Sequence, residues 1–295
     1  MDRTQIKRER LREGLEAERP LIVLGAHDAM SALLVERAGF PAVWVSGFGV
    51  STMTHALPDL NLITMSEALD AARRIDAATT LPVIADCDNG YGGLINVVRT
   101  VREYERAGIS AICVEDNVFP KRNSLFRGQT RRDLIPREEQ ARRIRAAKRA
   151  QETEEFVFIA RVEALIAGHG VQEACDRAEA YAEAGADAVL IHSRDKSLAE
   201  IRGFLDEWKG RGTNVPLVAV PTLFPDFTAD QLHMLGFQVI IWANQLMRAS
   251  VQAMEETLVT LASERKVAAA DPSIARVDHV FELVKTKETI ELDEA

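Results

Sequence analysis

The chain has 295 residues, of which 47% are hydrophobic and 27% charged, a composition that supports a substantial core in one large or two smaller domains. Its formal net charge of -9 argues against a general attraction to nucleic acid or to anionic membranes. The first twenty residues are too charged for a secretory signal, and no apolar run reaches the roughly 20 residues of a membrane span, so we expect a cytoplasmic protein. The three cysteines form no CxxC pair, which indicates neither a disulfide framework nor a zinc site.

Eight short segments along the chain contain strand candidates. In chain order they are 21–26, 36–47, 82–88, 105–116, 156–163, 182–193, 216–222 and 233–244. In four of them, such as ERAGISAICVED (105–116), a helix ends at a glycine, and an apolar strand and a polar residue follow. Glycine provides the left-handed residue that ends a helix, and a continuous apolar strand is typical of a parallel sheet covered on both faces. Helices are expected between the strands, for example at 65–77, 94–107, 137–152 and 171–184.

The number and order of these segments predict the fold. Eight β/α units in about 225 residues are typical of a (β/α)8 TIM barrel. No linker rich in Pro, Gly or Ser divides the chain, so we predict a single domain over residues 1–295, with a barrel core at about 20–250 and a C-terminal helical extension at 251–295. An open, doubly wound sheet is the alternative, but no GxGxxG motif follows the first strand.

Polar residues gather at the carboxyl ends of the predicted strands. In a TIM barrel the active site is built at this end, so these residues are candidates for one common site. The candidates are Ser46, Asp86, Asp88, Glu115, Asp116, Arg161, Glu163, His192, Ser193, Thr222 and Asn244.

Asp86 and Asp88 flank Cys87 at the end of the third predicted strand. With a period of two, both aspartates lie on one face of the strand while Cys87 faces the other way. Two carboxylates this close are costly unless a cation or a proton lies between them. Together with Glu115 on the next strand, they favour a partly hydrated Mg²⁺. The alternative is that the aspartates cap a helix or serve the turn formed by NGYGG.

Arg161 lies within the apolar segment FVFIARVE, so its charge must be paired or bound to an anion. It can bridge Glu163 or Glu115, or it can bind a substrate carboxylate or phosphate with its forked donors. His27 and His192 each follow an apolar strand, a place where a histidine is often a structural group.

Several motifs together resemble a known family. They are SGFGVS (46–51), PDLN (58–61), ADCDNGYGG (85–93), EDNVFPKRNS (115–124), ARVEAL (160–165) and HS (192–193). Over about residues 20 to 250 they resemble the phosphoenolpyruvate mutase/isocitrate lyase superfamily, and within it the phosphoenolpyruvate mutases. Family members carry an E-D-K-x5-N-S signature, in which the acids lie at the metal site and the following loop closes over the substrate.

This resemblance implies interconversion of phosphoenolpyruvate and 3-phosphonopyruvate by intramolecular phosphoryl transfer, with Mg²⁺ as cofactor. Asp86 would hold the metal, and Asp88 and Glu115 would hold its water molecules. Ser46, Gly47 and Phe48 would receive the substrate carboxylate beside Trp44, and Arg161 and His192 would bind the enolate or phosphoryl oxygens. Lys121, Asn123 and Ser124 would lie on the closing loop, and Asp59 would lie close to the migrating phosphoryl group.

The same motifs bear on the alternatives. Asn117 stands where family mutases commonly have the lysine of E-D-K. The carbon-carbon lyases of the superfamily carry a cysteine in the loop, typically in a K-[KR]-C-G-H pattern, whereas this chain reads KRNS, which argues against a lyase. Phosphonopyruvate hydrolase is closer, but it tends to have threonine at the position of Asn123. Another carbon-carbon or carbon-phosphorus reaction on a 2-oxoacid, and a catalytically inactive metabolite-binding barrel, are the remaining alternatives.

The segment after residue 250 reads as helices joined by ADPS. In this superfamily the terminal helix commonly crosses to a neighbouring subunit. The resemblance therefore implies a homotetramer with exchanged C-terminal helices.

Overall fold

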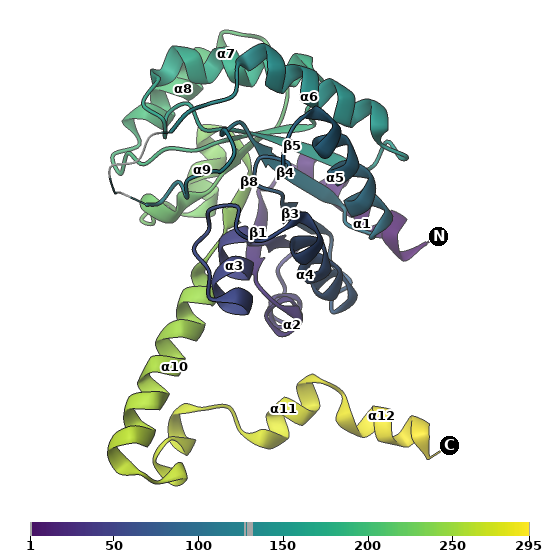
Figure 1. Cartoon of the computed structure of the whole chain (residues 1–295), viewed down its shortest axis with the longest axis vertical. Helices are drawn as coiled ribbons and strands as arrows, with labels where there is room; N and C mark the ends of the chain where they lie inside the picture. Colours follow the sequence, from purple (N-terminus) through teal and green to yellow (C-terminus); the bar gives the residue numbers. More distant parts are fainter. Residues whose placement is uncertain (1, 127, 129–131, 295) are drawn as a thin grey trace. The chain divides into compact units, whose positions relative to one another are not determined.

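A computed structural model describes residues 2–126, 128 and 132–294 of the chain. Eight parallel strands close into a barrel in sequence order, and each strand pairs with the next, the last with the first (Figure 1). The strands are β1 (Leu21–Ala26), β2 (Ala42–Val45), β3 (Val83–Asp86), β4 (Ala111–Glu115), β5 (Val157–Val162), β6 (Ala188–Ile191), β7 (Leu217–Ala219) and β8 (Phe237–Trp242). The predicted TIM barrel is confirmed.

Helices alternate with the strands. They are α1 (Arg3–Glu16), α2 (Ala29–Arg37), α3 (Gly47–His55), α4 (Met65–Ala77), α5 (Leu94–Arg106), α6 (Arg137–Ala150), α7 (Gly170–Glu183), α8 (Ala199–Lys209) and α9 (Ala229–Leu235). The predicted helix at 65–77 has the bounds of α4, and the three others differ by one or two residues at their ends.

Two strands, β3 and β7, end at least two residues before the predicted limit. The sequence predicts an extended segment throughout 82–88, but β3 ends at Asp86, and Asp88 has a left-handed backbone with φ 51°. The segment 216–222 ends its strand at Ala219, and a 3-10 helix follows at Pro221–Leu223. Proline cannot donate a hydrogen bond to the sheet, and its fixed φ suits the first turn of a helix.

The apolar side chains divide into two layers because strand residues alternate between faces. One cluster fills the inside of the barrel, and the other lies between the strands and the outer helices. Helix α1, which the sequence pattern does not predict, contributes Leu11 and Leu15 to the inner cluster. This cluster packs the interior, so polar groups can gather at the carboxyl ends of the strands.

The chain divides into two compact units, Met1–Met247 and Arg248–Ala295. The barrel strands all belong to the first unit. The remaining helical elements are α10 (Gln245–Glu264), two 3-10 turns (Val267–Ala269 and Asp271–Ser273), α11 (Val277–Leu283) and α12 (Thr286–Asp293). Over the described ranges, none of the helices is long and apolar enough to cross a membrane.

Candidate active site

The alternation of strand residues places a polar layer directly above the packed interior. At the ends of β2, β3, β4, β5 and β6, an apolar residue inside the barrel is followed two positions later by a polar residue. The same face of the strand therefore carries first a packing residue and then a functional one. The pairs are Trp44 and Ser46, Ile84 and Asp86, Cys113 and Glu115, Ile159 and Arg161, and Leu190 and His192.

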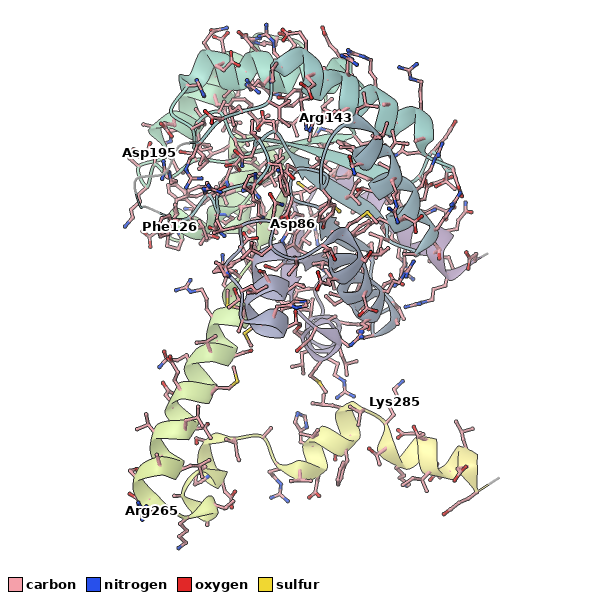
Figure 2. The ribbon with its side chains drawn as sticks, viewed as in Figure 1. Asp86, Phe126, Arg143, Asp195, Arg265 and Lys285 are labelled. Atoms are coloured by element: carbon pink, nitrogen blue, oxygen red, sulfur yellow. The ribbon has the colours of Figure 1, made fainter. Side chains whose placement is uncertain are left out.

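These polar ends line a cavity of about 60 Å³. Of the residues to which the family resemblance assigns a role, all except Gly47 and Asp88 line it, whereas the strand-end candidates Asp116, Glu163 and Ser193 do not. Figure 2 labels Asp86 in the cavity wall and Phe126 on the loop after β4. The predicted residues in its wall are Trp44, Ser46, Phe48, Asp59, Asp86, Glu115, Lys121, Asn123, Ser124, Arg161 and His192.

Two acids, Asp86 and Glu115, face the cavity from neighbouring strands. A Cβ atom at Gly47 would lie 3.1 Å from Asp86 Oδ2, so the glycine allows the start of α3 to approach this carboxylate closely. Burial raises the pKa of Glu115 to about 8, although the positive charge of Arg161 opposes the rise. Asn117 Nδ2 donates to Glu115 Oε1 at 3.0 Å, so an uncharged amide contacts this acid where family mutases carry lysine.

Asp88 does not share the strand face of Asp86, contrary to the sequence prediction. The strand has ended, and the left-handed turn directs the Asp88 carboxylate to Lys121 Nζ, with which it forms an ion pair, and to Asn61 Nδ2 at 2.8 Å. Burial raises the pKa of Asp88 to about 6, and the charge of Lys121 opposes that rise. In this structure Asp88 therefore holds Lys121 of the loop after β4 and Asn61 of the loop before α4 instead of lining the cavity.

Residues 121–125 of the segment after β4 form part of the cavity wall and contact Asp59 from the segment before α4, an arrangement that we call the closed loop. Lys121 Nζ lies 2.8 Å from Asp59 Oδ1, and Asn123 Nδ2 donates to Asp59 Oδ2 at 2.7 Å. The Arg132 guanidinium donates to loop carbonyl oxygens, including that of Asn123 at 2.9 Å. Burial favours a neutral Lys121, but Asp59 and Asp88 outweigh it and raise the lysine pKa. The described part of the loop is thus held closed by charged contacts.

Arg161 is the centre of a second network. Its Nε donates to Glu163 Oε1 at 2.5 Å and lies 3.4 Å from Glu115 Oε2, so the bridge to these acids, one of the two alternatives for this arginine, is present. Its Nη2 donates to Ser124 Oγ at 2.7 Å and lies 3.1 Å from His192 Nδ1. Burial favours a protonated Glu163, but Arg161 outweighs it and lowers the pKa of that acid. Arg161 nevertheless lines the cavity, where its charge can act on a ligand.

The N-terminus of α3 forms another wall. Ser46 precedes the helix, and its Oγ accepts from the Gly49 N–H at 3.1 Å. Gly47 and Phe48 are the first two helical residues, so their N–H groups have no acceptor within the helix. Such N–H groups, together with the positive end of the helix dipole, favour an anion. This wall can bind a carboxylate.

Comparison with known protein families identifies the family to which the chain belongs. The family model of phosphoenolpyruvate phosphomutase matches residues 11–262. The chain belongs to the phosphoenolpyruvate phosphomutase family. A phosphonopyruvate hydrolase from Variovorax sp. (strain Pal2) is 42% identical over 278 residues, which are 94% of each chain.

Two solved structures extend this finding. The crystal structure of a phosphoenolpyruvate phosphomutase from Streptomyces platensis subsp. rosaceus matches with a TM-score of 0.93 and 41% identity, covering 97% of this chain and 98% of that chain. A phosphonopyruvate hydrolase solved in complex with oxalate and Mg²⁺ matches with a TM-score of 0.90 and 38% identity, covering 98% of both chains. The protein is therefore an enzyme of the phosphoenolpyruvate mutase/isocitrate lyase superfamily, and its near relatives include both mutases and hydrolases.

Several residues of the cavity wall have no counterpart among the roles that the family resemblance implies. Thr222 and Asn244 stood among the strand-end candidates, and their position was the signal that could have placed them in the site. Arg122 and Leu125 also line the cavity, but only the folded course of the loop brings them there. His27 is buried and, within the part of the chain that the structure describes, its Nδ1 has no hydrogen-bond partner.

Proposed function

We propose that the enzyme is a phosphoenolpyruvate mutase, which moves a phosphoryl group between the enolate oxygen and C3 of pyruvate. The observation that carries the proposal is the closed loop, in which Lys121 and Asn123 both contact Asp59 above a cavity of about 60 Å³. A mutase must return the phosphoryl group to another atom of the same bound pyruvate, so water has to be excluded. Such a reaction would supply a carbon-phosphorus bond, as the first step of phosphonate synthesis requires.

The residues present fit a hydrated Mg²⁺. Asp86 and Glu115 offer the hard carboxylate oxygens that this ion prefers. Within the described residues, no three His, Cys, Asp or Glu side chains are grouped closely enough to hold a metal by themselves. Mg²⁺ commonly keeps several water molecules and binds through one or two carboxylates and the substrate, so Asp86 would hold it directly and Glu115 through water. Asp88, which is ion-paired with Lys121 outside the cavity wall, would hold a water of the ion only when the loop moves. When bound, the ion supplies positive charge that stabilises an enolate.

The remaining groups would position the substrate. The N–H groups of Gly47 and Phe48 and the Ser46 hydroxyl would bind the carboxylate, which would lie beside Trp44. In the direction from phosphonopyruvate, the carbon-phosphorus bond breaks and leaves its electron pair on the pyruvate enolate. The enolate oxygen then forms the new bond to phosphorus, with Arg161 and His192 stabilising the developing charges.

The loop and Asp59 would contact the phosphoryl group during its transfer. Asp59 would lie next to it, and Lys121, Asn123 and Ser124 would move with the loop from their present contacts to the ligand. In the closed loop, Ser124 Oγ donates to Glu163 Oε2 at 2.7 Å, so one loop residue already reaches the Arg161 network. These contacts support a role for the loop in both closure and charge stabilisation.

Hydrolysis of phosphonopyruvate is the second candidate, favoured by the 42% identity to a phosphonopyruvate hydrolase. Coupled assays separate the two activities. Lactate dehydrogenase alone detects the pyruvate formed by hydrolysis, and the further addition of pyruvate kinase and ADP detects phosphoenolpyruvate as well. We expect most of the signal to require pyruvate kinase. A signal that needs only lactate dehydrogenase would establish a hydrolase, and no signal in either assay would favour an inactive binding barrel.

We also propose a homotetramer with exchanged C-terminal helices. The second unit, Arg248–Ala295, is too short to bury a large core, and many of its apolar side chains are exposed. They include Leu258, Val259, Val277, Phe281 and Leu292. Light scattering at micromolar concentration should give four times the chain mass of 32.6 kDa, and a monomer mass would contradict the assembly. The cytoplasmic location stays a prediction.

A further inference from the structure

Asn244 and Thr222 form a polar pair that the proposed function leaves without a role. Asn244 follows the end of β8, and Thr222 lies in the 3-10 helix after β7. Both line the cavity on the side of β7 and β8, whereas Asp86 and Glu115 enter it from β3 and β4. In a closed eight-stranded barrel these two sides lie opposite each other.

Asn244 is buried but incompletely bonded. Asn244 is only 4% exposed, and its side-chain Nδ2 donates to Thr222 Oγ1 at 3.2 Å. Its Oδ1 has no hydrogen-bond partner among the described residues. An unsatisfied buried amide oxygen costs about 1–3 kcal/mol, and buried polar groups in folded proteins are nearly always paired. Because Asn244 lines the cavity, a molecule bound there can provide the missing partner.

The pair can serve an anion because the threonine hydroxyl both accepts and donates. If the amide turns over, Oδ1 accepts from the Thr222 hydroxyl, and Nδ2 faces the cavity as a donor. The bond between the two residues survives, and the cavity gains a neutral N–H donor. In the other orientation the cavity faces an amide oxygen, which suits a water molecule in the free enzyme.

The backbone that carries Asn244 is fixed. A Cβ atom at Gly25 of β1 would lie 2.1 Å from the Ala243 carbonyl oxygen, so only glycine allows the end of β8 to pack this closely on β1. The Asn244 N–H donates to Gln245 Oε1 at 3.0 Å. A side chain on so constrained a backbone can be aimed precisely enough to position a ligand.

We propose that Asn244, oriented by Thr222, donates a hydrogen bond to an oxygen of the bound anionic 2-oxoacid. The inference rests on the proposed function for the identity of that ligand. Asn244 is a ligand-binding residue, and Thr222 is a positioning residue that sets which end of the amide faces the cavity. The ligand is thereby bound from the side of the cavity that lies opposite Asp86 and Glu115.

The test compares Asn244→Asp, Thr222→Val and Thr222→Ser with a matched control, Asn214→Asp, which makes the same charge change at an exposed residue outside this cavity. Calorimetry with oxalate and Mg²⁺ measures binding without turnover, and KM for phosphonopyruvate is measured in parallel. We expect Asn244→Asp to raise the Kd of oxalate, the KM for phosphonopyruvate, or both, by at least about tenfold, because it removes a donor and adds a charge of the same sign as the ligand. Thr222→Val should raise the same constant about threefold, whereas Thr222→Ser, which keeps the hydroxyl, should leave it at the wild-type value.

The two ligands locate the contact. Weaker binding of both ligands assigns Asn244 to the carboxylate end of the 2-oxoacid. A higher KM for phosphonopyruvate with unchanged oxalate affinity assigns it to the phosphoryl end. The inference is overturned if Asn244→Asp, folded by thermal melting, stays within about twofold of the Asn214→Asp control for both ligands. A wild-type enzyme that binds oxalate but does not convert phosphonopyruvate would contradict the proposed function, while the oxalate comparison would still decide the role of Asn244.

Discussion

Replacing Asn123 by alanine should convert part of the mutase reaction into hydrolysis. In the closed loop, Asn123 Nδ2 donates to Asp59 Oδ2 at 2.7 Å, and its Oδ1 accepts from the Leu125 N–H at 2.9 Å. Alanine can form neither hydrogen bond, so the loop is left without one anchor to Asp59 and one internal bond. The space vacated by the amide also admits water beside the phosphoryl group.

The magnitude follows from the removal of a single positioned donor. Removing one such donor from a reacting group typically lowers kcat by about 10²-fold, which corresponds to about 2.7 kcal/mol in the barrier. Lys121 remains on Asp59, so closure is weakened but not abolished. We therefore expect mutase turnover to fall about 10²-fold while the fraction of phosphonopyruvate released as phosphate rises.

The assay measures phosphoenolpyruvate and inorganic phosphate from the same reaction, and limited trypsin digestion reports on the loop. Cleavage after Lys121 or Arg122 should be slower when Mg²⁺ and a phosphonate inhibitor are bound, and the Asn123 variant should be cut faster than wild type. Val118→Ala, which shortens an exposed side chain of the same segment, is the control. Unchanged product partitioning together with ligand-independent cleavage would show that the segment is an ordinary surface turn.

Three further changes test other parts of the structure. Asp86→Ala should abolish activity and its dependence on Mg²⁺ while thermal melting stays nearly unchanged; near-normal turnover would refute the metal assignment. Asp59→Ala should abolish turnover with little change in oxalate affinity, because Lys121 keeps Asp88 as an ion-pair partner; parallel losses of stability and activity would indicate a structural role instead. Leu11→Ala should lower the free energy of unfolding by about 3 kcal/mol in urea titrations, since α1 places this side chain fully inside the barrel cluster; a loss below about 1 kcal/mol would argue against that packing.

The sequence predicted the barrel because its signals are local and periodic. Each strand is a short apolar run, and the polar residue two positions after an interior residue marks the active end, as Ile84 and Asp86 show. The same rule failed at Asp88 because the strand ends at Asp86, and a left-handed turn redirects the next aspartate. Periodicity cannot predict where a strand stops.

Helix α1 and the loop contacts lay beyond sequence reasoning for other reasons. Leu11 and Leu15 stand among many charged residues, so the segment reads as a solvated surface although it packs on the barrel interior. Asn123 and Asp59 are 64 residues apart, and nothing in either local sequence specifies the other as its partner. The family resemblance suggested that both belong to the site, but their direct bond is a tertiary contact that only the structure reveals.

The most direct test of the proposed mutase activity is a phosphorus NMR spectrum of phosphonopyruvate incubated with the enzyme and Mg²⁺. One spectrum distinguishes the carbon-bonded phosphorus of the substrate, the phosphate ester of phosphoenolpyruvate and free phosphate. We predict that the substrate resonance is replaced by that of phosphoenolpyruvate, with little free phosphate. Conversion to free phosphate and pyruvate, with no phosphoenolpyruvate at any time, would contradict the account.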